Sequence, residues 1–143
     1  MKKYKTGYMA GVYDLFHVGH LNLMMRAKEQ CEYLIVGVLT DEEVVRWKPQ
    51  PPFIPYEERV RIVAAVRYVD QVVGVSSDNI TRIDAWKRYR FDCQFSGDDY
   101  ANDKGWLYDQ QQLRMVGSDL VFLPYTKTTS STKIRTLINQ ALQ

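Results

Sequence analysis

The sequence has little of the chemistry that crosslinks small secreted proteins or holds metal ions. It contains two cysteines, Cys31 and Cys93, and two histidines among its 143 residues. Two cysteines so far apart form neither a metal-ligand spacing nor a disulfide framework, which predicts free thiols in a reducing compartment. Metal-binding histidine pairs on a helix usually stand four residues apart with a glutamate beside the first, whereas His17 and His20 stand three apart. The sequence therefore predicts no metal site.

Long apolar runs and a strong charge of one sign are also missing. No stretch reaches the roughly 18 apolar residues of a membrane span, and the N-terminal MKKYKTGYMAG lacks the apolar core of a signal peptide. The net charge is +2, and basic and acidic residues are interspersed, which argues against a nucleic-acid partner. We therefore expect a cytoplasmic protein with no nucleic-acid partner and no membrane insertion, folded as a single domain over residues 1–143.

What the sequence does contain is a regular alternation of short apolar runs and amphipathic segments. Tyr8–Tyr13 predicts a buried strand, His17–Gln30 a helix, and the wholly apolar Tyr33–Leu39 a strand covered on both faces. Further strands are expected at 71–75, 92–95 and 120–123, and further helices at 55–67, 80–89, 106–116 and 131–142. This pattern predicts an α/β fold, a Rossmann-like open parallel five-stranded sheet with helices on both faces. The segment 40–55 is expected to lie in the loop beyond the second strand, with its prolines gathered in the breaker-rich stretch Lys48–Pro52.

Residues of unusual chemistry gather where the predicted strands end. The four segments concerned are Gly11–His20, Thr40–Pro55, Ser96–Tyr100 and Pro124–Thr132. Ligands of open parallel sheets bind beyond the carboxyl ends of the strands. The sequence therefore predicts that these four segments meet at one site.

The segment Gly11–His20 reads GVYDLFHVGH and carries the strongest chemical signal. Gly11 and Gly19 would let a ligand approach the backbone, and the N-terminus of the following helix favours a phosphate group. His17 and His20 can donate hydrogen bonds to phosphoryl oxygens and can carry charge near neutral pH. The ordinary alternative is that a histidine near a helix start is a cap or a surface residue. The segment predicts a site for a nucleoside triphosphate.

GVYDLFHVGH resembles the GxFDxxHxGH signature of the cytidylyltransferase superfamily. Three further segments resemble family motifs in the same order: Tyr56–Arg59 with RYVD at 67–70, GDD at 97–99, and SSTKIR at 130–135. The resemblance covers nearly the whole chain, and its RYVD segment is similar to bacterial enzymes that act on glycerol 3-phosphate. It implies a homodimer that transfers CMP from CTP, carried with Mg2+, to a phosphorylated alcohol and releases pyrophosphate.

The resemblance also implies a role for individual residues. His17, His20 and Lys48 would stabilise the transition state at the phosphates. The nucleotide would be bound by Gly11, Val12, Tyr13, Gly19, Asp98, Thr126, Ser130, Ser131 and Thr132. The acceptor would be bound by Arg59, Arg67 and Lys127. Plainer alternatives remain. Arg59 and Arg67 could each be an ion-pair partner on a helix surface, Arg67 with Asp70, and Lys48 could be a solvated loop lysine. Residues 130–132 could supply a plain helix N-cap, and Asp14 could fix the turn.

The chain departs from the family pattern at four positions. Tyr125 stands in place of an arginine, Thr128 of a glycine, Gln50 of a second lysine and Tyr100 of a tryptophan. Tyr100, Trp106 and Tyr125 either form an aromatic wall suited to a quaternary ammonium such as phosphocholine or pack as ordinary core. Two other functions stay open, namely an adenylyltransferase acting on a sugar phosphate and a catalytically inactive nucleotide-binding subunit.

Overall fold

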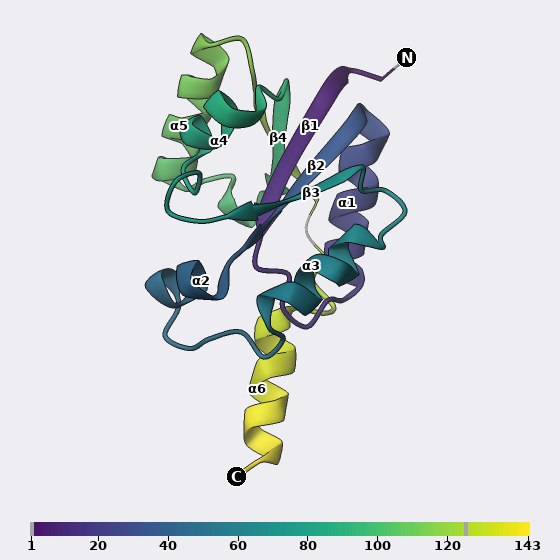
Figure 1. Ribbon diagram of the computed structural model, residues 1–143, viewed down its shortest axis with the longest axis vertical. Coiled ribbons are helices and arrows are strands. Elements are labelled where there is room, and N and C mark those ends of the chain that lie inside the picture. Colours follow the sequence, from purple (N-terminus) through teal and green to yellow (C-terminus); the bar gives the residue numbers. More distant parts are fainter. Residues whose placement is uncertain (1, 125) are drawn as a thin grey trace.

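The computed structural model describes residues 2–124 and 126–143, and it places five strands in one parallel sheet (Figure 1). The strands are β1 (Tyr4–Gly11), β2 (Cys31–Leu39), β3 (Gln71–Val75), β4 (Cys93–Gly97) and β5 (Leu120–Leu123), in the spatial order β3-β2-β1-β4-β5. The helices are α1 (Val18–Gln30), α2 (Asp41–Trp47), α3 (Tyr56–Ala64), α4 (Arg82–Tyr89), α5 (Lys104–Met115) and α6 (Ser131–Ala141). The predicted Rossmann-like α/β fold is confirmed.

Helices α1 and α3 cover one face of the sheet (Figure 1). Met24 of α1 and Val63 of α3 are fully buried against Val36 and Val38 of β2. The apolar run of β2 is buried because helices cover both faces of a parallel sheet. This core fixes the direction in which α1 leaves the end of β1.

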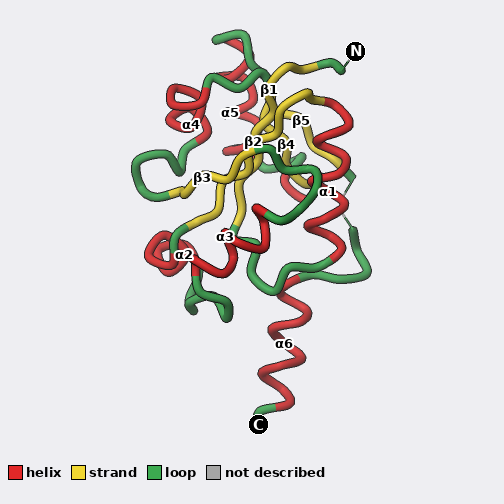
Figure 2. Tube along the Cα trace, turned by 45° about the vertical axis from the view of Figure 1, so that its right-hand side comes forward, coloured by secondary structure: helices red, strands yellow, loops and turns green. Residues whose placement is uncertain are grey.

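Helices α4 and α5 cover the opposite face of the sheet (Figure 2). Ala85 of α4 and Leu113 of α5 pack there with Leu120 of β5. The ring of Tyr8 on β1 stacks on Phe91 at a centroid distance of 4.9 Å. The residues of β4 alternate between the two faces, with Cys93 and Phe95 on the α1 side.

The expectation of a loop over residues 40–55 is wrong in its first half, where helix α2 forms. Thr40 caps this helix by accepting a hydrogen bond from the backbone N–H of Glu43 at 3.2 Å. Three acidic residues in the first turn suit the positive end of the helix dipole, and Val44 is buried beneath it. The prolines therefore confine the irregular segment to residues 48–55.

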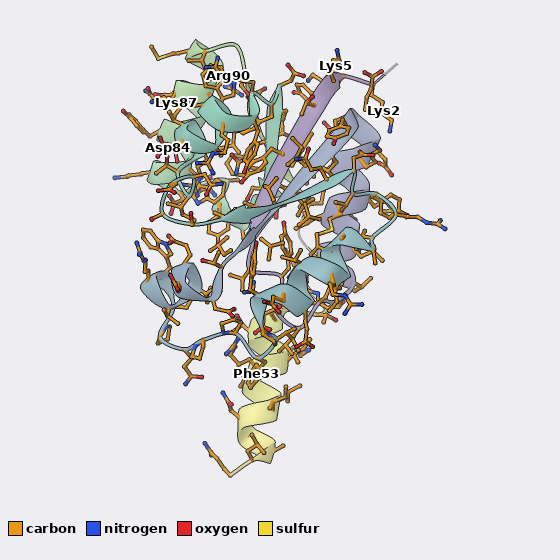
Figure 3. All side chains as sticks on the ribbon, viewed as in Figure 1. Lys2, Lys5, Phe53, Asp84, Lys87 and Arg90 are labelled. Atoms are coloured by element: carbon orange, nitrogen blue, oxygen red, sulfur yellow. The ribbon has the colours of Figure 1, made fainter. Side chains whose placement is uncertain are left out.

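Helix α6 leaves the body of the molecule and ends at the C-terminus (Figures 1 and 2). Its side chains, including the exposed Leu137, project without a covering element along its outer half (Figure 3). Its first turn is fixed to the body, because Ser131 and Arg135 both reach Asp14. No helix within residues 2–124 and 126–143 is long and apolar enough to cross a membrane.

Candidate active site

A pocket of about 610 Å³ opens at the carboxyl ends of β1 and β4. The strand order reverses between these two strands, so the pocket lies at the switch point where open α/β sheets bind ligands. The N-terminal ends of α1 and α6, the end of α2 and the first residue of α4 also line it. All four segments that the sequence singled out contribute residues to the lining of this one pocket.

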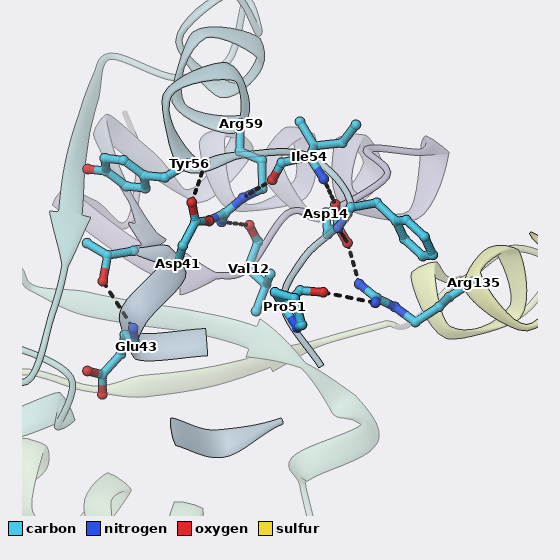
Figure 4. Close-up of polar contacts among 11 residues, drawn as sticks. Val12, Asp14, Asp41, Glu43, Pro51, Ile54, Tyr56, Arg59 and Arg135 are labelled. Atoms are coloured by element: carbon cyan, nitrogen blue, oxygen red, sulfur yellow. Dashed lines mark hydrogen bonds and ion pairs between the residues drawn. The ribbon is translucent and has the colours of Figure 1, made fainter. Parts of the chain in front are cut away.

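Asp14 organises the turn between β1 and α1 (Figure 4). It is buried, and its carboxylate accepts hydrogen bonds from the backbone N–H groups of Phe53 at 2.8 Å and Ile54 at 2.9 Å. Arg135 of α6 forms an ion pair with the same carboxylate. The residues on either side of Asp14, Tyr13 and Leu15, have φ angles of 56° and 52°. Asp14 therefore stabilises a turn whose backbone is unfavourable for these side chains, and it ties three segments of the pocket together.

His17 and His20 form a reciprocal cap at the start of α1. Nδ1 of His17 accepts the backbone N–H of Gly19 at 3.0 Å, and Nδ1 of His20 accepts the backbone N–H of His17 at 3.2 Å. A neutral imidazole with an accepting Nδ1 carries its proton on Nε2. The two rings, 4.0 Å apart between centroids, therefore each offer an Nε2–H donor. Capping and phosphate binding are compatible here because they use different ring nitrogens.

Burial keeps both imidazoles neutral. The pKa of His20 is lowered to about 3, mainly by desolvation. The neighbouring His17 also lowers this pKa, by more than Asp14 raises it. Desolvation also lowers the pKa of His17. The expectation that these histidines carry charge near neutral pH is therefore wrong for the unliganded protein, because the fold removes the water that would solvate an imidazolium. They act as neutral donors.

The two glycines of the motif are required by the chain's own side chains. A Cβ atom at Gly19 would lie 2.7 Å from Cε1 of His17, so any larger residue would displace the imidazole. A Cβ atom at Gly11 would lie 3.0 Å from Cζ of the buried Tyr13. Gly19 therefore leaves the space that the His17 imidazole occupies. The sequence predicted only that this glycine would let a ligand approach the backbone.

The hydroxyl cluster at the start of α6 divides its roles. Ser130 accepts the backbone N–H of Lys133 at 3.0 Å and is the N-cap, while Ser131 donates to the carbonyl oxygen of Asp14 at 2.6 Å. Thr132 is exposed, and all three residues line the pocket. The N-terminus of α6 thus faces the pocket as the N-terminus of α1 does, and both favour phosphate groups there.

Arg59 does not bind a ligand in the way that the family resemblance implied (Figure 4). Its side chain is fully buried, and its guanidinium donates to the carbonyl oxygens of Ile54 at 2.9 Å and Val12 at 2.6 Å and pairs with Asp41 at 2.7 Å. It is not among the residues that line the pocket. Its acceptor-binding role is corrected to a structural one, because its donors hold α2, α3 and the end of β1 together.

Four other predicted residues lie outside the pocket lining, namely Asp98, Thr126, Arg67 and Lys127. Of the two acids that follow β4, Asp99 lines the pocket, and its pKa is raised by desolvation and by Asp98 beside it. Asp98 is thus replaced by its neighbour, because the one-turn helix after β4 sends successive side chains in different directions.

The other three residues of this group have different surroundings. Thr126 accepts a hydrogen bond from Asn22 at 3.1 Å and so touches α1. Arg67 and Lys127 are exposed. The alternative ion pair between Arg67 and Asp70 is not formed, because Asp70 pairs with Lys28 at 2.5 Å.

Aromatic residues on the α4–α5 side form a stack that the sequence only partly predicted. Tyr100 stacks on Trp106 with ring centroids 4.7 Å apart, and the guanidinium of Arg82 lies 3.6 Å from the Trp106 ring centre. Arg82 also pairs with Asp109 at 2.9 Å. Tyr125, the third expected member of this wall, lies outside the described residues. Tyr100 and Trp106 both line the pocket, and Trp106 also packs against the core on this face of the sheet.

Sequence reasoning missed three polar residues of the lining, Arg82, Gln94 and Arg135. Gln94 gave a signal, because a glutamine in an otherwise apolar strand needs a partner. Arg135 was quoted within the SSTKIR motif, but its pairing with Asp14 spans 121 residues and leaves no local pattern.

The described residues hold no group of three or more His, Cys, Asp or Glu side chains that could bind a metal ion. Lys48 ends α2, and its exposed side chain lines the pocket. The site therefore combines neutral imidazole donors, two helix N-termini, hydroxyl groups and a mobile ammonium. That set of groups fits a polyphosphate, since each is a donor or a positive pole.

Comparison with known proteins points to a family whose members act on nucleotides. Residues 8–137 match the family described as Cytidylyltransferase-like. The chain is 34% identical over 134 residues to FAD synthase of Pyrococcus abyssi, covering 92% of this chain and 88% of that protein. It is 34% identical over 125 residues to glycerol-3-phosphate cytidylyltransferase of Bacillus subtilis, covering 87% and 90%.

Among solved structures, the fold is similar to the lipopolysaccharide core biosynthesis protein of Thermoplasma volcanium. The TM-score is 0.70 at 19% identity, over 88% of this chain and 99% of that one. The protein belongs to the cytidylyltransferase-like family of nucleotidyltransferases, and the resemblance inferred from its motifs is confirmed.

Proposed function

We propose that this protein is a cytidylyltransferase that joins CMP from CTP to a phosphorylated alcohol, with glycerol 3-phosphate as the preferred acceptor. The observation that carries the proposal is the pair of Nε2–H donors from His17 and His20, set between the N-termini of α1 and α6. The similarity to the Bacillus subtilis enzyme over most of both chains supports the choice of acceptor. CTP enters with Mg2+ as part of the substrate.

The reaction is a displacement at the α-phosphorus of CTP. An oxygen of the acceptor phosphate forms a bond to that phosphorus, the bond to the bridging oxygen of the β-phosphate breaks, and pyrophosphate leaves. The acceptor oxygen is already anionic near neutral pH, so no general base is required. Rate acceleration then comes from positioning and from donors aimed at the developing charge.

His17 and His20 would donate to the α- and β-phosphate oxygens, whose charge increases in the transition state. Lys48 would add a positive charge from the segment between α2 and α3, and its flexible side chain can follow the phosphates. The start of α6 would bind the β- and γ-phosphates through Ser130, Ser131 and Thr132. Each of these roles can be tested by substituting the residue concerned.

The binding of the base and the acceptor follows from the same lining. Val12 and Tyr13 at the end of β1 would contact the nucleotide, and Asp99 would accept from the exocyclic amine of cytosine. The resemblance also assigns Arg67 and Lys127 to the acceptor and Thr126 to the nucleotide, although none of the three lines the pocket. The protein would act as a homodimer in the cytoplasm.

A turnover assay that measures pyrophosphate release tests the proposal. We expect activity with CTP and glycerol 3-phosphate in the presence of Mg2+, and at least a hundredfold loss of kcat in His17→Ala with the fold retained, as for removal of an oxyanion donor. Circular dichroism of the variant controls for folding. Unchanged activity in His17→Ala would contradict the mechanism.

The second candidate is an adenylyltransferase, and the similarity to the Pyrococcus abyssi FAD synthase favours it. Offering ATP against CTP with each acceptor, FMN included, separates the two. A wide preference for ATP would replace the leading proposal. Absence of turnover with either nucleotide, together with nucleotide binding, would favour an inactive nucleotide-binding subunit.

A further inference from the structure

Gln94 is a buried polar residue whose chemistry the fold leaves unused. It lies on β4 and is 4% exposed, and its Cα is paired with Tyr8 on one side and Leu120 on the other. Its amide oxygen has no hydrogen-bond partner within the described residues. A buried polar atom without a partner is costly, and native structures keep few of them. This one belongs to a side chain that lines the pocket.

The position of Gln94 is on the far side of the pocket from the histidines. Cys93 and Phe95, its chain neighbours, pack in the core beneath α1, so the alternation along β4 turns Gln94 towards α4 and α5. Ser96 lies two residues further along the strand, turns the same way and also lines the pocket. Under the proposed function, the phosphates of the substrates would bind on the α1 and α6 side. Gln94 is therefore placed for the part of a substrate that extends away from its phosphates.

The indole of Trp106, which lines the same pocket as Gln94, is not available to a cationic head group. A guanidinium 3.6 Å from the centre of the Trp106 ring and a tyrosine ring stacked at 4.7 Å cannot occupy the same face of the indole. Arg82 and Tyr100 therefore cover both faces of Trp106. A quaternary ammonium binds over an aromatic face, and here that place is filled by the chain's own Arg82.

We infer that Gln94 is a specificity-determining residue that hydrogen-bonds a hydroxyl group of the acceptor, so that the site selects neutral polyol phosphates over phosphocholine. This inference rests on the proposed cytidylyl transfer. A hydroxyl both donates and accepts, so it satisfies the Gln94 amide in either orientation, and the terminal torsion of glutamine turns freely enough to meet it. A trimethylammonium group has no N–H or O–H to offer.

Steady-state kinetics with three proteins and two matched acceptors test the inference. The proteins are the wild type, Gln94→Met and Tyr8→Phe, and the acceptors are glycerol 3-phosphate and propyl phosphate, which has the same phosphate without the hydroxyls. Tyr8 is the matched control because its hydroxyl is also buried without a partner on the same face, but it does not line the pocket. CTP with Mg2+ is held at saturation, and thermal unfolding is measured without substrate.

We expect the wild type to prefer glycerol 3-phosphate over propyl phosphate by about tenfold in kcat/KM and to use phosphocholine poorly. Gln94→Met should raise KM for glycerol 3-phosphate about tenfold, leave KM for CTP unchanged and remove the preference over propyl phosphate. Its Tm should be unchanged or higher, because an unpartnered amide has been removed. Tyr8→Phe should also keep or raise Tm, with unchanged kinetics.

The outcomes separate this inference from the proposed function. If the wild type turns over glycerol 3-phosphate but Gln94→Met keeps the preference, or loses both acceptors equally, the inference fails and the proposed function stands. If the wild type shows no preference for glycerol 3-phosphate over propyl phosphate, or favours phosphocholine, the wild-type data alone refute the inference. If no phosphorylated alcohol is a substrate, both fail.

Discussion

Replacing His20 by asparagine should remove most of the protein's sensitivity to mild acid. In the folded protein, burial lowers the pKa of His20 to about 3, whereas an unfolded chain has a histidine pKa of about 6.5. Between these two values the unfolded chain binds more protons than the folded protein does. The free energy of unfolding therefore rises with pH across this window and levels off above about pH 6.5.

The size of the effect follows from the two pKa values. Each pH unit within the window changes the free energy of unfolding by about 1.4 kcal/mol, so acidification from pH 7 to pH 5 removes about 2 kcal/mol through His20 alone. His17 adds to the loss with the same sign, because its pKa is also lowered. Asparagine can keep the accepting atom that His20 offers to the backbone N–H of His17. The variant should lose some stability at pH 7, since the rings of Tyr13 and Phe16 lose contact with the imidazole, but its pH dependence should be flatter.

Urea unfolding of both proteins at pH 7, 6 and 5 measures the difference, and titrating groups that do not interact with His20 cancel in the comparison. We expect the stability gap between wild type and His20→Asn to shrink by about 2 kcal/mol from pH 7 to pH 5. Because the chain has two histidines, proton NMR can follow each of them separately. Parallel stability curves, or a His20 resonance that titrates near pH 6.5, would refute the argument that burial holds this imidazole neutral.

Two further substitutions test the local architecture. Arg59→Met should lower the free energy of unfolding by about 3 kcal/mol, because two carbonyl oxygens and Asp41 lose a buried donor. The control Arg67→Met, at an exposed position, should change the free energy of unfolding by less than about 0.5 kcal/mol. Equal unfolding midpoints in urea for the two variants would contradict the structural role of Arg59. Gly19→Ala should lower kcat at least tenfold and lower the free energy of unfolding by about 1 kcal/mol, because the added Cβ displaces the His17 cap. A variant with normal kinetics would show that catalysis does not need His17 in its capped position.

The sheet was predictable because its signals are local. Gln71–Val75 and Leu120–Leu123 have the predicted bounds, since short apolar runs between breakers can form little else in an α/β chain. Helix α2 was missed because its apolar residues are too few for a clear period, and its cap at Thr40 and its acidic first turn were hidden beside the prolines. Local caps decided that element more than hydrophobic periodicity did.

The candidate site was predictable where a motif is contiguous and hard to predict where partners are far apart in sequence. The histidines, both motif glycines and the hydroxyl cluster all line the pocket. Arg59 was misassigned because an arginine on a helix gives no sign that its guanidinium is buried. Its three acceptors come from Val12, Asp41 and Ile54, and only the fold brings them together.

Most of the basic side chains that line the pocket are already paired with carboxylates. Three described Lys or Arg side chains line the pocket, and two of them are already paired, Arg135 with Asp14 and Arg82 with Asp109. Both histidines are neutral, so they contribute dipoles rather than charges. Lys48 alone among these three has no carboxylate partner. The Coulombic attraction for a polyphosphate is therefore concentrated in one exposed, flexible ammonium and two helix N-termini, while the buried groups fix geometry. In the proposed reaction, such a division would let the rigid part of the site align the reacting phosphate and leave the flexible ammonium of Lys48 free to follow the leaving pyrophosphate.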